Sequence, residues 1–168
     1  GNSSSADFFV DGVRDDVQYH RDLYNVERIE ALKGPNATIF GRGGGGGVVN
    51  RVIKQAQFGP SREAVLQAGS HGHKRAAVDV DQPLGAAAAF RLNAFYEDSD
   101  SFRRAVGLER YGLNPTVTIA PTDRTRVVLG YEHLHDRRVA DRGVSSWEGR
   151  PADVDPSTYY GNPADSHV

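Results

Sequence analysis

The stretch FRLNAFYE, residues 90–97, alternates between apolar and mostly polar side chains. A period of two residues is typical of a β-strand whose two faces meet different surroundings. The apolar positions are Phe90, Leu92, Ala94 and Tyr96, and the opposite positions include Arg91, Asn93 and Glu97. The stretch therefore predicts a strand with one apolar and one polar face.

The same alternation recurs on both sides of this stretch, in five consecutive segments between Arg62 and Glu132. The apolar faces of the other four segments are Ala64, Leu66 and Ala68; Ala76, Val78 and Val80; Tyr111, Leu113, Val117 and Ile119; and Val127, Leu129 and Tyr131. Five such segments in a row predict an antiparallel meander with one apolar and one polar face.

The connections of this meander differ in length at its two ends. Residues 82–87 and 120–125 are short, whereas residues 97–107 and the tract after Asp136 are long and charged. Short turns at one end and long loops at the other are typical of outer-membrane barrels, although the short connection at 70–73 departs from this pattern. A soluble sandwich shows the same alternation. Charged side chains on the polar face, and tyrosines near the strand ends, favour the barrel.

The first 58 residues follow a different pattern, in which short apolar groups are mixed with turn signals such as Asp11-Gly12. We expect single helical turns and short strands there. The expected helical turns are residues 23–28 and 37–40, and the expected strands include 29–33 and 48–53. The sequence thus predicts a mixed α/β segment at 1–58 and an all-β meander at 59–168.

Composition excludes several functional classes. The 168 residues include no cysteine, which rules out disulfides and thiolate chemistry. A net charge of −2 gives no bulk electrostatic reason to bind nucleic acid. No apolar run approaches the ~18 residues of a membrane-spanning helix. The chain has no methionine and both of its ends are polar, so we expect it to be a piece of a longer protein.

Residues 41–47, GRGGGGG, formally match the dinucleotide-binding fingerprint. That fingerprint needs a helix after the glycines, and the β-branched stretch that follows predicts a strand. We therefore interpret the run as a packing feature, in which backbone without Cβ atoms passes close to neighbouring strands. Its members are Gly43, Gly44, Gly45, Gly46 and Gly47. A soluble nucleotide-binding enzyme is the alternative, and a helix after Gly47 would favour it.

We find no catalytic motif and expect neither a catalytic residue nor a cofactor. His133 and His135 lie two residues apart, share a strand face and could bind a metal ion together with Asp136. Histidines at a strand end without a third fixed ligand are more often solvated, so the sequence predicts no metal site.

Three stretches together resemble TonB-dependent siderophore receptors of the bacterial outer membrane, most closely their catecholate and ferrichrome-type branch. They are FFVDGVRDD at 8–16, RDLYNVERIEALKGPNATIFGRGGGGGVVNRVIK at 21–54 and DRGVSSWEGRPADVDPSTYYGNP at 141–163. The resemblance implies the C-terminal half of a plug domain at 1–58, followed by about five strands of a 22-stranded transmembrane β-barrel. A long external loop would end the chain.

The resemblance also implies a function. Such a receptor binds a ferric siderophore and transports it into the periplasm, and it is not an enzyme. Its partners would be outer-membrane lipid and the TonB inner-membrane energising complex, which acts through an N-terminal box missing from this chain; nucleic acid is not among them. The location would be the outer membrane of a Gram-negative bacterium. The sequence leaves open which siderophore is carried, or whether the cargo is haem, cobalamin or a sugar. A soluble β-domain that binds carbohydrate or protein is a further alternative.

The resemblance assigns roles to particular residues. Aromatic and cationic side chains suit an anionic ferric complex, although each of them can equally be an ordinary loop residue. The candidate siderophore contacts are Gln18, Tyr19, Arg21, Tyr24, Trp147, Tyr159 and Tyr160. Arg28, Glu30 and Lys33 resemble plug charges that pair with the barrel, because charges buried in a lumen need partners.

Overall fold

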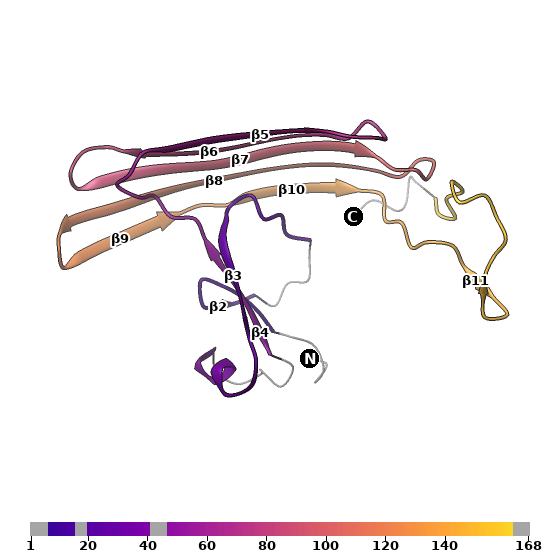
Figure 1. The fold of residues 1–168 in the computed structure, drawn as a ribbon, viewed down its shortest axis with the longest axis horizontal. Coiled ribbons are helices and arrows are strands. Elements are labelled where there is room, and N and C mark those ends of the chain that lie inside the picture. Colours follow the sequence, from indigo (N-terminus) through magenta and orange to yellow (C-terminus); the bar gives the residue numbers. More distant parts are fainter. Residues whose placement is uncertain (1–6, 16–19, 41–46, 163–168) are drawn as a thin grey trace. The chain divides into compact units, whose positions relative to one another are not determined.

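The computed structural model describes residues 7–15, 20–40 and 47–162 (Figure 1). The chain divides into two compact units, Gly1–Ala56 and Gln57–Val168. This division falls close to the boundary expected at residue 58. Within the described part, no helix is both long enough and apolar enough to cross a membrane.

The first unit contains a four-stranded sheet and one 3-10 helix. The sheet has the order β2-β1-β4-β3, in which β1 and β4 are parallel and the other neighbours are antiparallel. Its strands are β1 (Asp7–Val10), β2 (Val13–Arg14), β3 (Val26–Leu32) and β4 (Val48–Ile53), and the helix is η1 (Gly34–Phe40). A small core joins them, in which the rings of Phe9 and Phe40 meet edge to face at 4.8 Å.

The helical part of the expectation is met only in part. The turn expected at 37–40 lies inside η1, but the described residues contain no α-helix. The turn expected at 23–28 is wrong, because the chain enters β3 at Val26. Asp22 does accept a hydrogen bond from the backbone N–H of Tyr24 at 3.0 Å, as a cap would. The β-branched Val26 then pairs with Ile53 on β4, so sheet pairing prevails over the local helical signal.

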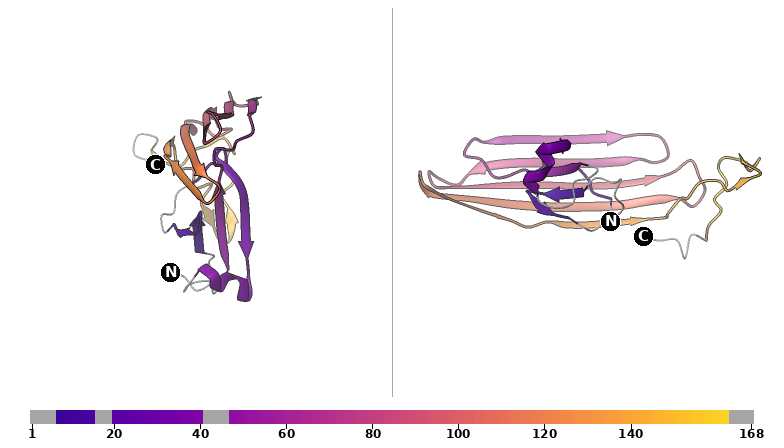
Figure 2. Two further views of the ribbon diagram at one scale, coloured as in Figure 1. Left: turned by 90° about the vertical axis from the view of Figure 1, so that its left-hand side faces the viewer. Right: turned by 90° about the horizontal axis from the view of Figure 1, so that it is seen from below.

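The second unit is the expected antiparallel meander (Figure 1, Figure 2). Its sheet has the order β10-β8-β7-β6-β5, and β9 also pairs with β8. The strands are β5 (Ser61–Ala68), β6 (Lys74–Pro83), β7 (Ala88–Asp100), β8 (Gly107–Thr122), β9 (Thr125–Gly130) and β10 (His133–Arg138). A small hairpin follows, formed by β11 (Ser146–Trp147) and β12 (Arg150–Pro151). Because β7 and β8 are longer than expected, the loop expected at 97–107 shortens to residues 101–106.

β9 and β10 continue one another in a single register along β8. Gly130 lies opposite Thr116 and His133 lies opposite Leu113, so the interruption falls at Pro115. Proline has no N–H to donate to a ladder. The side-chain amide of Asn114 takes its place and donates to the carbonyl oxygen of Tyr131 at 2.8 Å. The strand pair therefore survives a proline in the interior of the sheet.

A sheet of a soluble protein buries its apolar face and exposes its polar face. In this sheet the burial of the two faces is reversed. Large apolar side chains are exposed on one face: Val78, Tyr96, Tyr111, Leu113, Ile119, Val127 and Leu129. Polar and charged side chains are buried on the other: Asp79, Asp81, Asn93, Glu97, Asn114, Thr116 and Thr118. In FRLNAFYE, Asn93 and Glu97 of the polar face are buried, whereas the apolar face is partly exposed at Phe90, Leu92 and Ala94 and exposed at Tyr96.

Candidate functional site

The buried polar face is held together by ion pairs between neighbouring strands. Arg75 on β6 and Arg110 on β8 both lie opposite Glu97 on β7. One oxygen of the Glu97 carboxylate accepts hydrogen bonds from both guanidinium groups, at 2.5 Å from Arg75 and 2.7 Å from Arg110. The buried ring of Phe95 lies 4.6 Å from the Arg75 guanidinium carbon, a cation–π contact on the same face.

A second cluster lies further along the same face. The guanidinium of Arg91 donates to both oxygens of Asp79, at 2.8 and 2.7 Å, in the bidentate arrangement that gives the strongest charge-assisted bonds. With its amide nitrogen turned toward Asp79, Asn93 also donates to that carboxylate at 3.2 and 3.1 Å. Each buried charge of these two clusters therefore has a partner on an adjacent strand, as burial requires.

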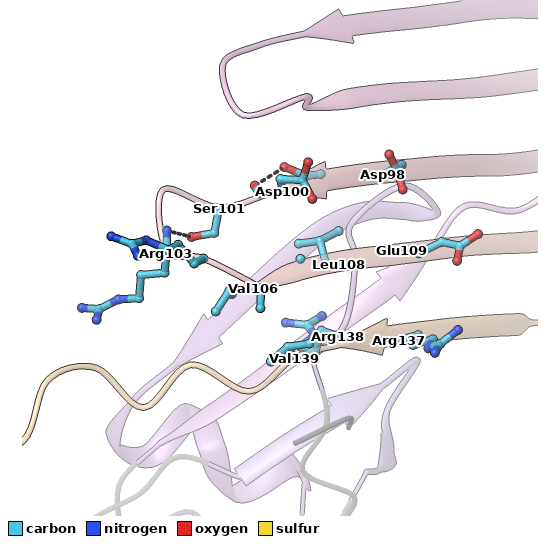
Figure 3. A pocket seen from close by; sticks show the side chains of 14 residues that line it. Asp98, Asp100, Ser101, Arg103, Val106, Leu108, Glu109, Arg137, Arg138 and Val139 are labelled. Carbon is cyan, nitrogen blue, oxygen red and sulfur yellow. Dashed lines mark hydrogen bonds between the residues drawn. The ribbon is translucent and has the colours of Figure 1, made fainter. Parts of the chain in front are cut away.

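A cavity of about 600 Å³ lies at the end of the sheet, around the loop between β7 and β8 (Figure 3). Figure 3 shows Asp98 and Asp100 on β7, Glu109 on β8, and Arg137 and Arg138 on β10 around it. Arg138 is paired with Asp136 on its own strand. The cavity is thus bordered by both carboxylates and guanidinium groups.

Two consecutive arginines of the cavity are held by the tract 139–162, which follows β10. Arg103 forms an ion pair with Asp141 at 2.8 Å and donates to the carbonyl oxygen of Thr158 at 3.0 Å. Arg104 forms an ion pair with Asp155 at 3.2 Å. Its backbone N–H also donates to the carbonyl oxygen of Ser157 at 3.0 Å. We call these contacts of Arg103 and Arg104 the loop latch.

The Asp155 carboxyl of the latch is exposed and well solvated. The backbone N–H of Ser157 donates to it at 2.8 Å and, with the Ser157 hydroxyl and Arg104, lowers the pKa of Asp155 from its ordinary value. The Asp155 carboxyl is therefore ionised at neutral pH. A negatively charged ligand in the cavity would compete with Asp141 and Asp155 for the two arginines.

Comparison with known proteins finds the same family likeness along nearly the whole chain. Residues 1–48 match the TonB-dependent Receptor Plug Domain. The catecholate siderophore receptor Fiu of Escherichia coli K12 is 34% identical over 145 residues, which are 86% of this chain and 19% of Fiu. The probable TonB-dependent siderophore receptor PiuA of Acinetobacter baumannii is 29% identical over 170 residues, 96% of this chain and 23% of PiuA. Over most of its length the chain is similar to TonB-dependent siderophore receptors.

Solved structures agree with this assignment. The crystal structure of PiuA matches with a TM-score of 0.83 at 28% identity, over 94% of this chain and 24% of that one. The open form of Fiu matches with a TM-score of 0.78 at 34% identity, over 84% of this chain and 22% of that one. The chain thus spans about a quarter or less of the length of these relatives. TonB-dependent siderophore receptors are outer-membrane proteins of Gram-negative bacteria and are not enzymes.

Of the siderophore contacts expected in the first unit of the receptor, Gln18 and Tyr19 lie outside the described residues. Arg21 forms an ion pair with Asp15, whose carboxylate also binds Arg51 at 2.9 Å. Tyr24 is partly buried in the turn before β3, and its carbonyl oxygen accepts a hydrogen bond from the Lys54 ammonium at 3.4 Å. The Arg21 charge thus already has a partner within the first unit.

The contacts expected in the tract 139–162 differ in exposure. Trp147, on the β11–β12 hairpin, is 75% exposed, and Tyr160 is 53% exposed. Tyr159 is partly buried, and its hydroxyl donates to the carbonyl oxygen of Ala140 at 3.2 Å. Trp147 and Tyr160 therefore have surface available for a ligand, whereas Tyr159 helps to fold the tract that carries them.

Two of the three charges expected to pair with the barrel, Arg28 and Glu30, have partners inside the first unit. Arg28 donates to Glu30 at 2.8 Å, and the Asn50 amide donates to the other oxygen of Glu30, also at 2.8 Å. The Asn50 hydrogen bond, followed by that of Arg28, lowers the pKa of Glu30 from its ordinary value. Lys33 is exposed. Pairing of these residues with barrel strands stays a prediction.

Gly47 is the described end of the glycine run, and Gly43, Gly44, Gly45 and Gly46 lie outside the described residues. Gly47 has a φ of 107°, and a Cβ atom there would lie 2.9 Å from the carbonyl oxygen of Leu32. Both facts restrict the position to glycine. The strand β4 follows directly, and no helix opens there, so the nucleotide-binding alternative is wrong.

The two histidines considered for metal binding pack against an aromatic ring. The rings of His133 and His135 lie 5.9 and 5.0 Å from that of Tyr111. Among the described residues, no group of three or more histidine or acidic side chains could hold a metal ion.

Sequence reasoning missed Arg103 and Arg104, the residues that bind the tract 139–162. The signal was present, because two adjacent arginines interrupt a loop that the pattern had already marked as long and charged. Their partners lie about 40 to 55 residues further along the chain, and only the structure brings the two segments together.

Proposed function

We propose that this chain forms the C-terminal half of the plug and the first strands of the 22-stranded barrel of a receptor that takes ferric siderophores across the outer membrane. The observation that carries the proposal is the inverted burial of the sheet. Outer-membrane barrels turn an apolar band toward lipid and a polar face toward the lumen. The exposed apolar and buried polar faces of β6, β7 and β8 fit those two environments.

The order of side chains along the exposed face supports the membrane assignment. Tyr96, Tyr111 and His135 lie in one row across β7, β8 and β10. Apolar side chains follow from that row to Ile119, about nine residues along β8, which is close to the ~9–11 residues of a strand that crosses a bilayer. The next row on the other side of the tyrosines is charged, with Lys74, Asp98, Glu109 and Arg137. The aromatic row suits the lipid–water interface.

This assignment places the loop latch outside the cell. Short turns are typical of the periplasmic end of such a barrel, and β8 and β9 are joined by only Asp123 and Arg124. The opposite end carries the cavity, the latch and the exposed Trp147 and Tyr160. Arginine and aromatic side chains suit an anionic ferric complex through charge and stacking. The names of Fiu, a catecholate siderophore receptor, and PiuA, a probable siderophore receptor, support this ligand class.

Energy for transport would come from the TonB complex of the inner membrane, the partner in the family's name, acting on the plug. The first unit would be part of that plug, and lipid would cover the exposed face of β6, β7 and β8. One relative favours a second cargo class: the metal-pseudopaline receptor CntO of Pseudomonas aeruginosa is 30% identical over 149 residues. A complex of a metal with pseudopaline is therefore the second candidate ligand.

Growth of a receptor-deletion strain under iron limitation, complemented with the full-length gene, tests the proposal. A panel of a ferric tris-catecholate, a ferric hydroxamate and a metal chelate of the second class identifies the cargo. We expect the catecholate to restore growth. Equal growth with and without the gene on every iron source would contradict the proposal.

A pair of matched variants tests the location of the site. Arg104→Ala removes a latch arginine, whereas Arg124→Ala removes an exposed arginine from the turn at the opposite end of the sheet. Binding of the ferric complex to purified receptor is followed by quenching of intrinsic fluorescence. We expect a several-fold change in Kd for Arg104→Ala and none for Arg124→Ala. A larger effect at Arg124 would place the binding site at the wrong end.

A further inference from the structure

The two ends of the tract 139–162 are held together by a single side chain. Arg103, in the loop between β7 and β8 (Figure 3), forms an ion pair with Asp141 at 2.8 Å, on the side where the chain leaves β10. The same guanidinium donates to the carbonyl oxygen of Thr158 at 3.0 Å, on the side where the chain comes back. Residues 142–157 are thus closed at their base, and we call them the closed loop.

A second contact closes the same base without a charge. The Tyr159 hydroxyl, on the returning side, donates to the carbonyl oxygen of Ala140, on the outgoing side, at 3.2 Å. Tyr159 is partly buried in this position. Compact surface loops whose ends lie close together frequently carry function. The base of the closed loop is therefore made by two independent contacts, one between charged groups and one between neutral groups.

Both ends of the closed loop are also attached to the β7–β8 connection through backbone hydrogen bonds. The N–H of Val139 donates to the carbonyl oxygen of Gly107, at the start of β8, at 3.1 Å. The N–H of Arg104 donates to the carbonyl oxygen of Ser157 at 3.0 Å. Residues 103–107 thus hold the closed loop from both of its sides.

The ion pair at the base is better shielded from water than the second ion pair of the loop latch. The side chains of Arg103 and Asp141 are 11% and 26% exposed, whereas those of Arg104 and Asp155 are 75% and 58% exposed. Exposed ion pairs contribute little, because water and salt screen them. The planar guanidinium of Arg103 also binds two acceptors at once, which the compact ammonium of a lysine does not reproduce. Arg103 is therefore the latch residue best suited to fix the shape of the closed loop.

We propose that Arg103 is a positioning residue for the ferric complex: by closing the base, it holds Trp147 of the closed loop in the arrangement that binds the ligand. This inference rests on the proposed function, in which Trp147 contacts an anionic ferric complex. A preformed loop does not have to be ordered when the ligand binds. If only a fraction of the receptors has the base closed, the apparent Kd rises by the inverse of that fraction. Direct contact of the ligand with Arg103, in competition with Asp141, is the alternative.

The test uses variants of the full-length receptor that open the base in different ways. Arg103→Lys keeps the positive charge but does not bind both acceptors. Tyr159→Phe removes the neutral contact and leaves every charge in place. Arg124→Lys, in the turn at the opposite end of the sheet, is the matched control for Arg103→Lys. Heat-modifiable migration in gels confirms that each receptor is folded.

Hydrogen exchange in the ligand-free receptor measures whether the base is closed. We expect the backbone N–H groups of residues 142–157 to exchange several-fold faster in Arg103→Lys and Tyr159→Phe than in the wild type and Arg124→Lys. Exchange in β7 and β8 should stay the same in all four receptors. Unchanged exchange of the closed loop in Arg103→Lys would overturn the proposal. This measurement needs no ligand, so its result does not depend on the siderophore assignment.

Binding and uptake of a ferric tris-catecholate then test the positioning role. We expect a several-fold higher Kd in Arg103→Lys and Tyr159→Phe, and an uptake rate at saturating ligand equal to that of the wild type, because bound ligand selects the closed base. A wild-type Kd in Arg103→Lys despite faster exchange would overturn the proposal. A raised Kd with unchanged exchange would assign direct contact instead. Failure of the proposed function is distinguishable from both outcomes, because the wild type would then bind no ferric complex, and the positioning role would fail with it.

Discussion

The exposed and buried faces of the β5–β10 sheet are built from the same strands, yet each would be unstable on the other side. The exposed face carries Leu113 and Leu129, which are 42% and 59% exposed, whereas the buried face carries Glu97 and Asp79 in ion pairs. The difference shows that ion pairs and hydrogen bonds, rather than apolar packing, hold the buried face of this sheet together. Each buried charge is tolerated because a neighbouring strand supplies its partner, directly opposite for Glu97 and two residues away along the strand for Asp79.

Replacing Glu97 with alanine should break the buried face most severely. The change leaves Arg75 and Arg110 close together without the carboxylate that both of them bind. Removing one partner from a buried charge cluster costs about 3–5 kcal/mol. Urea unfolding of the purified full-length receptor measures the free energy of unfolding. Glu109→Ala, on the exposed face of β8, is the control and should cost less than about 1 kcal/mol. Equal losses would mean that the two faces do not differ.

An arginine placed on the exposed apolar face tests whether that face lies against lipid. Leu92 lies halfway between Tyr96 and Ala88 on β7, at the expected middle of the bilayer. Leu92→Arg should destabilise the inserted barrel by about 2–4 kcal/mol, because a charge there must leave water for hydrocarbon. Asp98→Arg, on the same strand but beyond the tyrosine row, should cost about 0–1 kcal/mol. The folded fraction of each variant in lipid vesicles, measured by heat-modifiable migration in gels, tests this prediction. A water-exposed face would tolerate both variants alike.

A smaller effect is expected at Asn114, whose amide stands in for the missing N–H of Pro115. Asn114→Ala leaves the carbonyl of Tyr131 without this donor, which costs about 1–3 kcal/mol when the group is buried. Pro115→Val restores a backbone N–H at the neighbouring position. In that background the cost of Asn114→Ala should fall, and a double-mutant cycle on the free energy of unfolding measures the coupling. If the changes in the free energy of unfolding are additive, the Asn114 amide does not replace the N–H that is missing at Pro115.

The meander could be predicted from the sequence because each strand records its two environments at every second residue. In FRLNAFYE the period alone assigns Phe90 and Leu92 to one face and Arg91 and Asn93 to the other. The same period does not say which face is buried, and the structure supplies that answer. Phe95 breaks the pattern. It lies among the polar side chains, where the Arg75 guanidinium covers its ring.

Other features depended on contacts distant in sequence and could not be read locally. Asp98 and Asp100 have poor strand propensity, but β7 continues through them because its backbone pairs there with Glu109 and Gly107 on β8. The charge of Arg21 suggested a ligand contact, and its ion pair with Asp15 shows a structural use that composition does not reveal. The latch likewise joins the β7–β8 loop to residues beyond position 140. The strand-like stretch after the glycine run argued against a phosphate loop, but the close approach of Gly47 to the Leu32 carbonyl oxygen could be seen only in the structure.

The ion pair of Arg104 with Asp155 in the loop latch is exposed, so it should contribute far less to stability than the ion pairs of the buried face. The pKa of Asp155 is lowered in the folded receptor, chiefly by the Ser157 backbone N–H. A carboxyl with a lowered folded pKa stabilises the fold above its unfolded pKa and loses that contribution as the pH falls through the folded value. Acidification below the ordinary pKa of an aspartate should therefore loosen the tract 139–162 while the strands stay paired. Hydrogen exchange in this tract, followed between neutral and acidic pH, measures the loss. Asp155→Asn removes the titrating group and should flatten this pH dependence, and a profile unchanged in that variant would assign the loosening to another carboxyl.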